Sequence, residues 1–154
     1  MKPDISSKLQ SGVTLVEMLV VVVMIGILMS IAVPSYRDYM IKANRADAKA
    51  ALLKVASAQE KNYLQHHTYT TKLKGDNSQA PGALNVEAIS SYEHYTIAIS
   101  EADATGFIVT ATAREGQTQD KDCPVFAMDE AGRKFGGKLP ISDDTNEPEC
   151  WGNR

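Results

Sequence analysis

The stretch from Gly12 to Pro34, G-V-T-L-V-E-M-L-V-V-V-V-M-I-G-I-L-M-S-I-A-V-P, decides the fold of this chain. From Val13 to Val33 it has 21 residues, and its only ionisable side chain is that of Glu17. About 20 apolar residues at 1.5 Å each cross a hydrocarbon core of about 30 Å. The segment is therefore predicted to be a helix that can span a membrane.

Glu17 distinguishes this segment from a plain membrane anchor. A short polar leader, residues 1–12, precedes the apolar run, and the carboxylate lies five residues into it. A charge at the centre of a transmembrane helix costs about 3 kcal/mol on insertion scales, and less near a helix end. We therefore interpret Glu17 as a functional residue that needs a partner. The simpler alternative is an uncleaved signal anchor in which Glu17 has no special role.

The sequence S-G-V-T-L-V-E-M, residues 11–18, resembles the processing motif of type IV prepilins. In that family a membrane peptidase cuts after the glycine and methylates the new amino terminus, and the glutamate is needed for packing into the filament. The resemblance implies a cut between Gly12 and Val13 and makes Glu17 the assembly glutamate. Val13 departs from the family, which usually has phenylalanine there.

Gly26 and Pro34 are two weak points in the predicted helix. Proline removes one backbone hydrogen bond and clashes with the carbonyl four residues back, here that of Ser30. Glycine in a helix interior costs about 1 kcal/mol relative to alanine. In the pilin family the corresponding interval extends when subunits pack, so the resemblance gives Gly26 and Pro34 a role in assembly. The alternative is a kinked anchor with no further role.

The chain after Pro34 continues without glycine or proline and is rich in alanine, leucine and lysine, so we predict one helix from about Thr14 to Gln65. Its second half is amphipathic, with a stripe at helical spacing formed by Ala48, Ala51, Leu52, Val55, Ala58 and Tyr63. Ala43, Ala46 and Ala50 permit close approach of another helix, although helix propensity alone explains them equally well.

Strand signals follow a loop over residues 72–85. Alternating apolar residues predict strands at 95–100 and 107–113, then at 125–129 and, after a tight turn, at 133–135, where Gly136-Gly137 is read as a breaker. One long helix followed by antiparallel strands predicts an α+β fold, with the helix laid across a sheet of about four strands. The resulting division is a leader at 1–12, a membrane and filament-core segment at 13–34, and a globular domain at 35–154.

Two cysteines, Cys123 and Cys150, are the full complement. An even count in a small exported domain predicts a disulfide, whereas two buried thiols would indicate a reducing compartment. The C-terminal half also resembles the minor pilins of the PilE type, in which a first cysteine opens the third strand and a Cys-Trp pair, here Cys150-Trp151, ends the chain. The family fold that this implies is the long helix packed on a sheet, with a C-terminal disulfide loop.

The charge distribution is uneven. Residues 37–54 are net basic, whereas the chain from residue 55 onward carries fifteen acidic and nine basic side chains. Counting lysine and arginine alone would place the far side of the membrane segment in the cytoplasm. The cysteines and the pilin resemblance favour the opposite orientation, with the globular domain in the periplasm, and we adopt it.

Catalytic and metal-binding motifs are not found in the sequence. Adjacent His66 and His67 point about 100° apart on a helix and make a poor chelate. The acidic run at 143–149 lacks the spaced ligands and turn glycine of a calcium loop, so we expect no metal and no cofactor. Calcium in that run remains an alternative, because related pseudopilins hold calcium in a C-terminal loop. We expect a structural protein and not an enzyme.

The leading hypothesis is a subunit, of the minor type, of a type IV pilus. The resemblance implies a single-pass inner-membrane protein before assembly and an extracellular filament afterwards. It also implies major and minor pilins, prepilin peptidase and the inner-membrane assembly machinery as partners, in support of motility, adhesion or DNA uptake. The rivals are a type II secretion pseudopilin, a DNA-binding competence pilin and a membrane-anchored enzyme. Nucleic acid is not the expected partner, because the domain is acidic.

Overall fold

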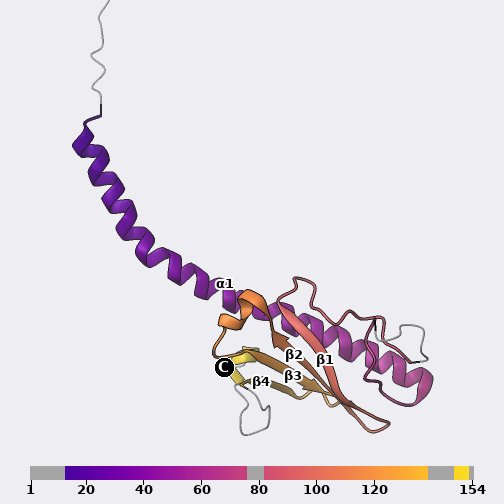
Figure 1. Ribbon diagram of the computed structural model, residues 1–154. Helices are drawn as coiled ribbons and strands as arrows, with labels where there is room; N and C mark the ends of the chain where they lie inside the picture. The colour runs from indigo at the N-terminus through magenta and orange to yellow at the C-terminus, as the bar shows by residue number, and fades with distance from the viewer. Residues whose placement is uncertain (1–12, 76–81, 139–147, 153–154) are drawn as a thin grey trace, which may run out of the picture. The chain divides into compact units, whose positions relative to one another are not determined.

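The computed structural model describes residues 13–75, 82–138 and 148–152. The chain divides into two compact units, Met1–Asp38 and Tyr39–Arg154. The cut proposed at Gly12 and most of the acidic run at 143–149 lie outside the described residues. Along the chain, a long helix is followed by two strands, a short 3₁₀ helix, two more strands and a further described 3₁₀ helix (Figure 1).

Helix α1, Leu15–His66, is one uninterrupted helix of 52 residues. Its bounds agree with the predicted 14–65 to within one residue, and the helix continues through both weak points, Gly26 and Pro34. The first unit contains its apolar half, which is long and apolar enough to cross a membrane by length and composition. Every described residue from 13 to 40 is exposed, so no described part of the chain buries the apolar side chains of this half.

The second half of α1 lies along one face of the sheet (Figure 1). Its buried residues are Asp47, Ala48, Leu52, Val55, Gln59 and Asn62. The apolar members join one core with alternate residues of the strands, among them Tyr95, Ile97, Val109 and Phe126. Burying each large apolar side chain stabilises the domain by about 1.5–3 kcal/mol, which is how the predicted stripe fixes the helix on the sheet.

The sheet has four antiparallel strands in the order β1-β2-β3-β4. They are β1, Tyr95–Ala102; β2, Phe107–Ala113; β3, Val125–Asp129; and β4, Lys134–Gly137. Burial alternates residue by residue at the start of β1 and β2, as expected for strands with one face on the core. The α+β fold, the order of elements and the position of each strand confirm the predicted architecture.

The predicted break at Gly136-Gly137 is wrong, because both glycines belong to β4. A Cβ atom on Gly136 would lie 2.7 Å from the Cβ of Cys150, closer than such atoms approach. Glycine in a strand often marks a place where another part of the chain comes very near. Here it makes room for the C-terminal 3₁₀ helix, Pro148–Trp151, that carries the second cysteine.

Buried polar residues of α1 hold the segment that leaves the helix. Gln59 is fully buried, and its amide donates to the carbonyl of Thr70 (2.6 Å) and accepts from the backbone N–H of Thr70 (3.0 Å). Asn62 donates to the carbonyl of Thr68 at 2.9 Å. These bonds satisfy backbone groups that would otherwise be buried without partners, and they position the loop that leads to β1.

Candidate functional site

The start of α1 gives Glu17 a local role that the sequence reasoning did not include. Its backbone N–H donates to the hydroxyl of Thr14 at 3.2 Å. Thr14 therefore caps the helix, and Glu17 stands at the third helical position of a T-x-x-E pattern. A carboxylate in the first turn also interacts favourably with the positive end of the helix dipole. The pattern T-x-x-E before an apolar run was the signal available in the sequence.

Gly26 and Pro34 both lie inside the continuous helix. A Cβ atom at Gly26 would meet nothing within 4 Å in the described part of the chain, so packing among these residues does not require the glycine. Next to Pro34, the hydroxyl of Ser35 donates to the carbonyl of Ile31 at 3.1 Å, and that of Ser30 donates to the carbonyl of Ile27 at 2.7 Å. Such hydroxyl bonds to the preceding turn weaken and bend helices slightly.

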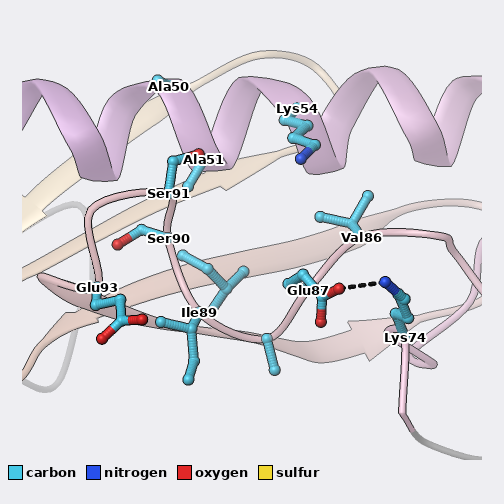
Figure 2. A pocket seen from close by; sticks show the side chains of 12 residues that line it. Ala50, Ala51, Lys54, Lys74, Val86, Glu87, Ile89, Ser90, Ser91 and Glu93 are labelled. Atoms are coloured by element: carbon cyan, nitrogen blue, oxygen red, sulfur yellow. Dashed lines mark hydrogen bonds and ion pairs between the residues drawn. The ribbon is translucent and has the colours of Figure 1, made fainter.

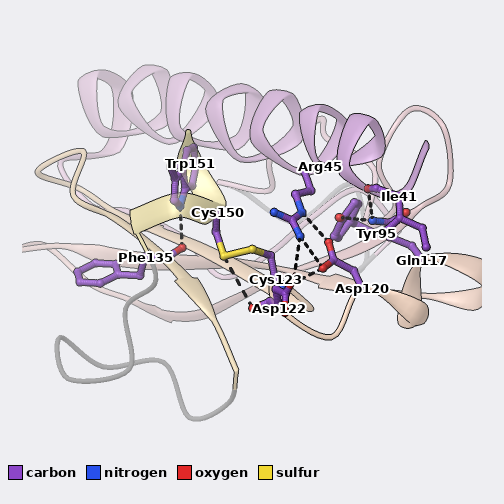
Figure 3. Close-up of a disulfide and its surroundings, with 10 residues drawn as sticks. All are labelled: Ile41, Arg45, Tyr95, Gln117, Asp120, Asp122, Cys123, Phe135, Cys150 and Trp151. Atoms are coloured by element: carbon purple, nitrogen blue, oxygen red, sulfur yellow. Dashed lines mark hydrogen bonds and ion pairs between the residues drawn. A yellow bond between two sulfur atoms is a disulfide. The ribbon is translucent and has the colours of Figure 1, made fainter. Parts of the chain in front are cut away.

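The predicted disulfide joins Cys123, just before β3, to Cys150, and their Cα atoms are 5.6 Å apart (Figure 3). Both cysteines are buried. The bridge closes the C-terminal segment onto the connection between β2 and β3. In the chain-entropy model a loop of this length stabilises the fold by roughly 3.5 kcal/mol.

An ion pair between Arg45 and Asp120 lies beside the disulfide (Figure 3). The guanidinium donates from Nε and Nη2 to the two carboxylate oxygens at 2.7 and 2.8 Å. Asp120 also accepts the backbone N–H of Cys123 at 3.0 Å, and this side chain is only 1% exposed. The hydrogen bond to Asp120 raises the pKa of Arg45. The pair fixes α1 to the cysteine-bearing connection.

A second polar link comes from the 3₁₀ helix Glu115–Gln119. Buried Gln117 donates to the carbonyl of Ile41 at 2.9 Å and to the hydroxyl of Tyr95 at 3.0 Å, and it accepts from the amide of Asn44 at 3.1 Å. Burial raises the pKa of Tyr95 well above its ordinary value of 10.0, whereas the hydrogen bond from Gln117 lowers it. This link was not predicted, because nothing in the spacing of these residues shows that they meet.

Trp151 follows Cys150, and two lysine side chains lie near its ring. Its indole N–H donates to the carbonyl of Phe135 at 2.8 Å (Figure 3), and its ring packs edge-on against Phe126. The ammonium groups of Lys49 and Lys134 lie 5.9 and 5.5 Å from the ring centroid, within the range of cation–π attraction. The C-terminal Cys-Trp pair thus supplies both a crosslink and an aromatic platform.

A groove of about 560 Å³ lies between α1 and the loop before β1 (Figure 2). Ala50 and Ala51 line its helix side, and Val86 and Ile89 line the loop side. Lys54 points into it, and Lys74 at its rim forms an ion pair with Glu87. Lys54 and Val86 also line a neighbouring hollow of about 440 Å³ that includes Lys61. The lining of the groove combines apolar side chains and lysines with the carboxylates of Glu87 and Glu93, and the described residues show no set of metal ligands.

The sequence-predicted site residues therefore fall into separate places. Cys123 and Cys150 meet in a disulfide. Val13, Glu17 and Gly26 lie in the first unit; the side chains of Val13 and Glu17 are exposed, and a Cβ atom at Gly26 would meet no described residue within 4 Å. The residues that reasoning missed are Arg45, Asp120 and Gln117, which join the helix to the domain.

Family models match two consecutive parts of the chain. One described as "Type IV minor pilin ComP, DNA uptake sequence receptor" matches residues 34–127. Another, described as a prokaryotic N-terminal methylation motif, matches residues 7–33. The second match includes the glycine, the glutamate and the apolar run on which the resemblance to prepilins rested.

Relatives with names of pilins and fimbrial proteins accompany these matches. The type IV major pilin protein PilE of Neisseria gonorrhoeae is 28% identical over 155 residues, covering 94% of this chain and 86% of that protein. A fimbrial protein of Neisseria meningitidis serogroup B is 33% identical over 84 residues, 54% of this chain and 47% of the relative. A fimbrial protein of Pseudomonas aeruginosa is 44% identical over 52 residues, 32% of this chain and 34% of the relative.

Among solved structures, the non-core minor pilin PilV of Neisseria meningitidis is 15% identical, with a TM-score of 0.49 over 68% of this chain and 93% of that one. The family assignment rests on the sequence matches, which together cover the apolar helix and most of the domain. These relatives are pilins and fimbrial proteins, which are structural proteins. The chain belongs to the type IV pilin family.

Proposed function

We propose that this chain is a structural subunit, of the minor type, of a type IV pilus. It is cut between Gly12 and Val13, held in the inner membrane by a single pass with its domain in the periplasm, and then built into an extracellular filament. One observation carries the proposal: the whole apolar half of α1 is exposed in a chain whose domain is otherwise well packed. A surface of that kind must be covered, first by lipid and then by other helices.

Assembly gives Glu17 its second role. A carboxylate among apolar helices is costly unless it is paired. The new amino terminus at Val13, on the same or on a neighbouring subunit, is the nearest positive charge that processing creates. At low dielectric such a pair is much stronger than in water, but only while both charges are present. Gly26 and Pro34 complete the proposal as the interval where α1 extends during packing.

The test replaces Glu17 and follows the protein through membrane and sheared-filament fractions. Glu17→Val makes the segment more apolar, so we expect normal membrane insertion and peptidase cleavage but loss from filaments. Glu17→Asp keeps the charge with a shorter reach and should be intermediate. The control is Asp38→Val, which removes a carboxylate outside the apolar run. Entry of Glu17→Val into filaments at the wild-type level would contradict the pairing role.

A second function, DNA uptake, is favoured by the description of the family model that matches residues 34–127. The feature to test is the group of lysines that line the groove, Lys54 and Lys74 (Figure 2), together with Lys61 in the neighbouring hollow. Binding through phosphates releases counterions and weakens steeply with salt. We expect a DNA-binding pilin to lose duplex binding in the variant Lys54→Gln with Lys61→Gln, measured by fluorescence anisotropy at two salt concentrations. Absence of salt-sensitive binding in the wild type would remove this second function.

A further inference from the structure

Exposed aromatic and apolar side chains continue along α1 beyond its apolar run. Tyr39, the first residue of the second unit, is 69% exposed, Met40 is 39% exposed, and Ala43 is exposed one turn later. The first unit also ends near an exposed tyrosine, Tyr36. The outer face of a helix on a globular domain ordinarily presents polar and charged residues to water. Residues 39–43, here called the juxtamembrane turn, instead present an aromatic and apolar surface that no described residue covers.

The side of the juxtamembrane turn that contacts the domain is a different one. The carbonyl of Ile41 accepts a hydrogen bond from Gln117, and the amide of Asn44 donates to Gln117, which lies in the 3₁₀ helix after β2. Tyr39 and Lys42 each stand two positions before one of these residues. Because successive residues of an α-helix are about 100° apart, Tyr39 and Lys42 lie on the far side of the helix.

The net positive charge of the juxtamembrane turn comes from Lys42. The formal charges of Arg37 and Asp38, just before the turn, cancel, and Arg45, just after it, is paired with Asp120. Lys42 is exposed and forms no ion pair with any residue in the described ranges. The aliphatic stem of a lysine lies along apolar surface while its ammonium reaches a polar group. An anionic group at this turn would therefore meet a cation that nothing described neutralises.

The length of the apolar run gives the depth of this turn when residues 13–33 cross a bilayer. As a helix, that run is about 32 Å long and matches a hydrocarbon core of about 30 Å. Tyr36 and Tyr39 follow Val33 by about 5 and 9 Å along the helix, beside a headgroup layer that is about 5–7 Å thick. Helical Cα–Cβ bonds tilt toward the amino terminus, here toward the bilayer. Tyrosine is enriched at this depth, because its ring is apolar and its hydroxyl is polar.

We propose that the juxtamembrane turn docks into the headgroup layer of the membrane, with Tyr36 and Tyr39 at the acyl boundary and the Lys42 ammonium against the phosphate of an anionic phospholipid. The inference rests on the proposed function, because it requires the single membrane pass. A phospholipid supplies both groups that the turn lacks, an amphipathic boundary for the tyrosines and an anion for the lysine. The contact fixes the depth of α1 before the chain is assembled.

The first test measures depth with the full chain in vesicles of phosphatidylcholine with phosphatidylglycerol as the minor lipid. Tyr39→Trp places a fluorophore in the turn, and a nitroxide on the lipid headgroup quenches it on contact. The wild type, whose single tryptophan is Trp151, gives the background. The matched control is Leu53→Trp, at a position that is 54% exposed and farther along the same helix. We expect quenching at position 39 to be at least about twice that at position 53. Equal quenching would overturn the proposal.

The second test asks whether Lys42 contacts the lipid phosphate. In Tyr39→Trp, omitting phosphatidylglycerol or raising the salt should lower the quenching to roughly half, because the attraction of a lysine to an anionic surface is screened. Adding Lys42→Gln should remove both dependences, whereas Lys42→Arg should keep them. Lys61→Gln removes the same charge at an exposed position farther along α1 and should change nothing. Dependence on lipid charge that persists in Lys42→Gln would overturn the contact with phosphate.

The outcomes separate this proposal from the one on which it depends. Resistance of the disulfide to alkylation confirms folding in each variant, and resistance to alkaline extraction confirms insertion. If the wild-type chain is extracted, the single pass and with it the proposed function fail. If the chain is inserted but Tyr39→Trp is quenched no more than Leu53→Trp, only the headgroup contact fails. Protection of Tyr39→Trp that grows with the ratio of protein to lipid would assign the turn to a neighbouring helix and overturn the lipid.

Discussion

The two halves of α1 differ in burial and in the contacts that their side chains make. In residues 15–38 every residue is exposed, and the hydroxyls of Ser30 and Ser35 donate to carbonyls of the preceding turn of the same helix. In residues 39–66 the same helix buries a stripe on the sheet and is joined to distant segments by Arg45, Asp47 and Gln59. The apolar surface of the first half needs partners outside the chain to cover it, whereas the second half is buried against the chain's own sheet. Changes in the second half should therefore alter stability, and changes in the first should alter assembly.

The largest effect on stability is expected at Arg45. Arg45→Met removes the cation and leaves the carboxylate of Asp120, which is 1% exposed, without its charged partner. Breaking one side of a buried pair costs about 3–5 kcal/mol. Urea unfolding of the full chain in detergent, followed by Trp151 emission, measures the loss. The control Arg114→Met breaks an exposed pair with Glu115 and should cost about 0.5 kcal/mol or less. Equal losses of unfolding free energy in the two variants would show that the pair with Asp120 stabilises the protein no more than the exposed pair does.

The disulfide should come next. Cys150→Ser opens the loop and is expected to lower the free energy of unfolding by roughly 2–4 kcal/mol. Cys123→Ser breaks the same bond and should cost a similar amount, and the double variant should cost little more than either. Membrane insertion should be unchanged in all three, because the crosslink lies wholly within the second unit. Fully additive losses would mean that the cysteines act through packing and not through their bond.

A smaller, pH-dependent effect is expected at Tyr95. Burial raises its pKa in the folded state above the ordinary 10.0, so the folded protein holds the phenolic proton more tightly than the unfolded chain does. Stability is therefore kept below pH 10 and falls as the pH rises above it. Denaturant unfolding at pH 8 and at pH 10.5 should show a drop in the wild type that is smaller in Tyr95→Phe. The same drop in both proteins would assign the effect to other groups.

Features that depend on local sequence patterns could be predicted, and contacts between distant residues could not. Periodicity predicted α1 and β1 to β3 nearly to the residue, because a continuous apolar run, a helical stripe and strict alternation are local properties. The disulfide was predictable from the even number of cysteines and from the expectation that the domain is exported. The pairs Arg45–Asp120 and Asp47–Ser90 join residues 75 and 43 positions apart, and no local pattern encodes such a meeting.

The sequence prediction also missed polar side chains that are buried in the domain. Asp47, Gln59 and Asn62 share the buried stripe of α1, although a hydrophobic pattern assigns such residues to the surface. They are buried because they hydrogen-bond to Ser90 or to the backbone that follows the helix. Gly136 was misread for a related reason, since its role depends on Cys150, which approaches from the end of the chain.

The smallest expected effect separates the two roles of Glu17. Thr14→Ala removes the hydroxyl that accepts the N–H of Glu17 and should weaken the first turn of α1 by about 1 kcal/mol, without changing the stability of the second unit. If Glu17 acts by charge pairing, Thr14→Ala enters filaments nearly as well as the wild type, whereas Glu17→Val does not. If Glu17 matters because it helps to form the first turn, the two variants should be depleted alike. Immunoblots of filament fractions, normalised to membrane protein, decide between these outcomes. We expect the first, because a fraying first turn is reordered when neighbouring helices pack around it, whereas an unpaired charge is not relieved by packing.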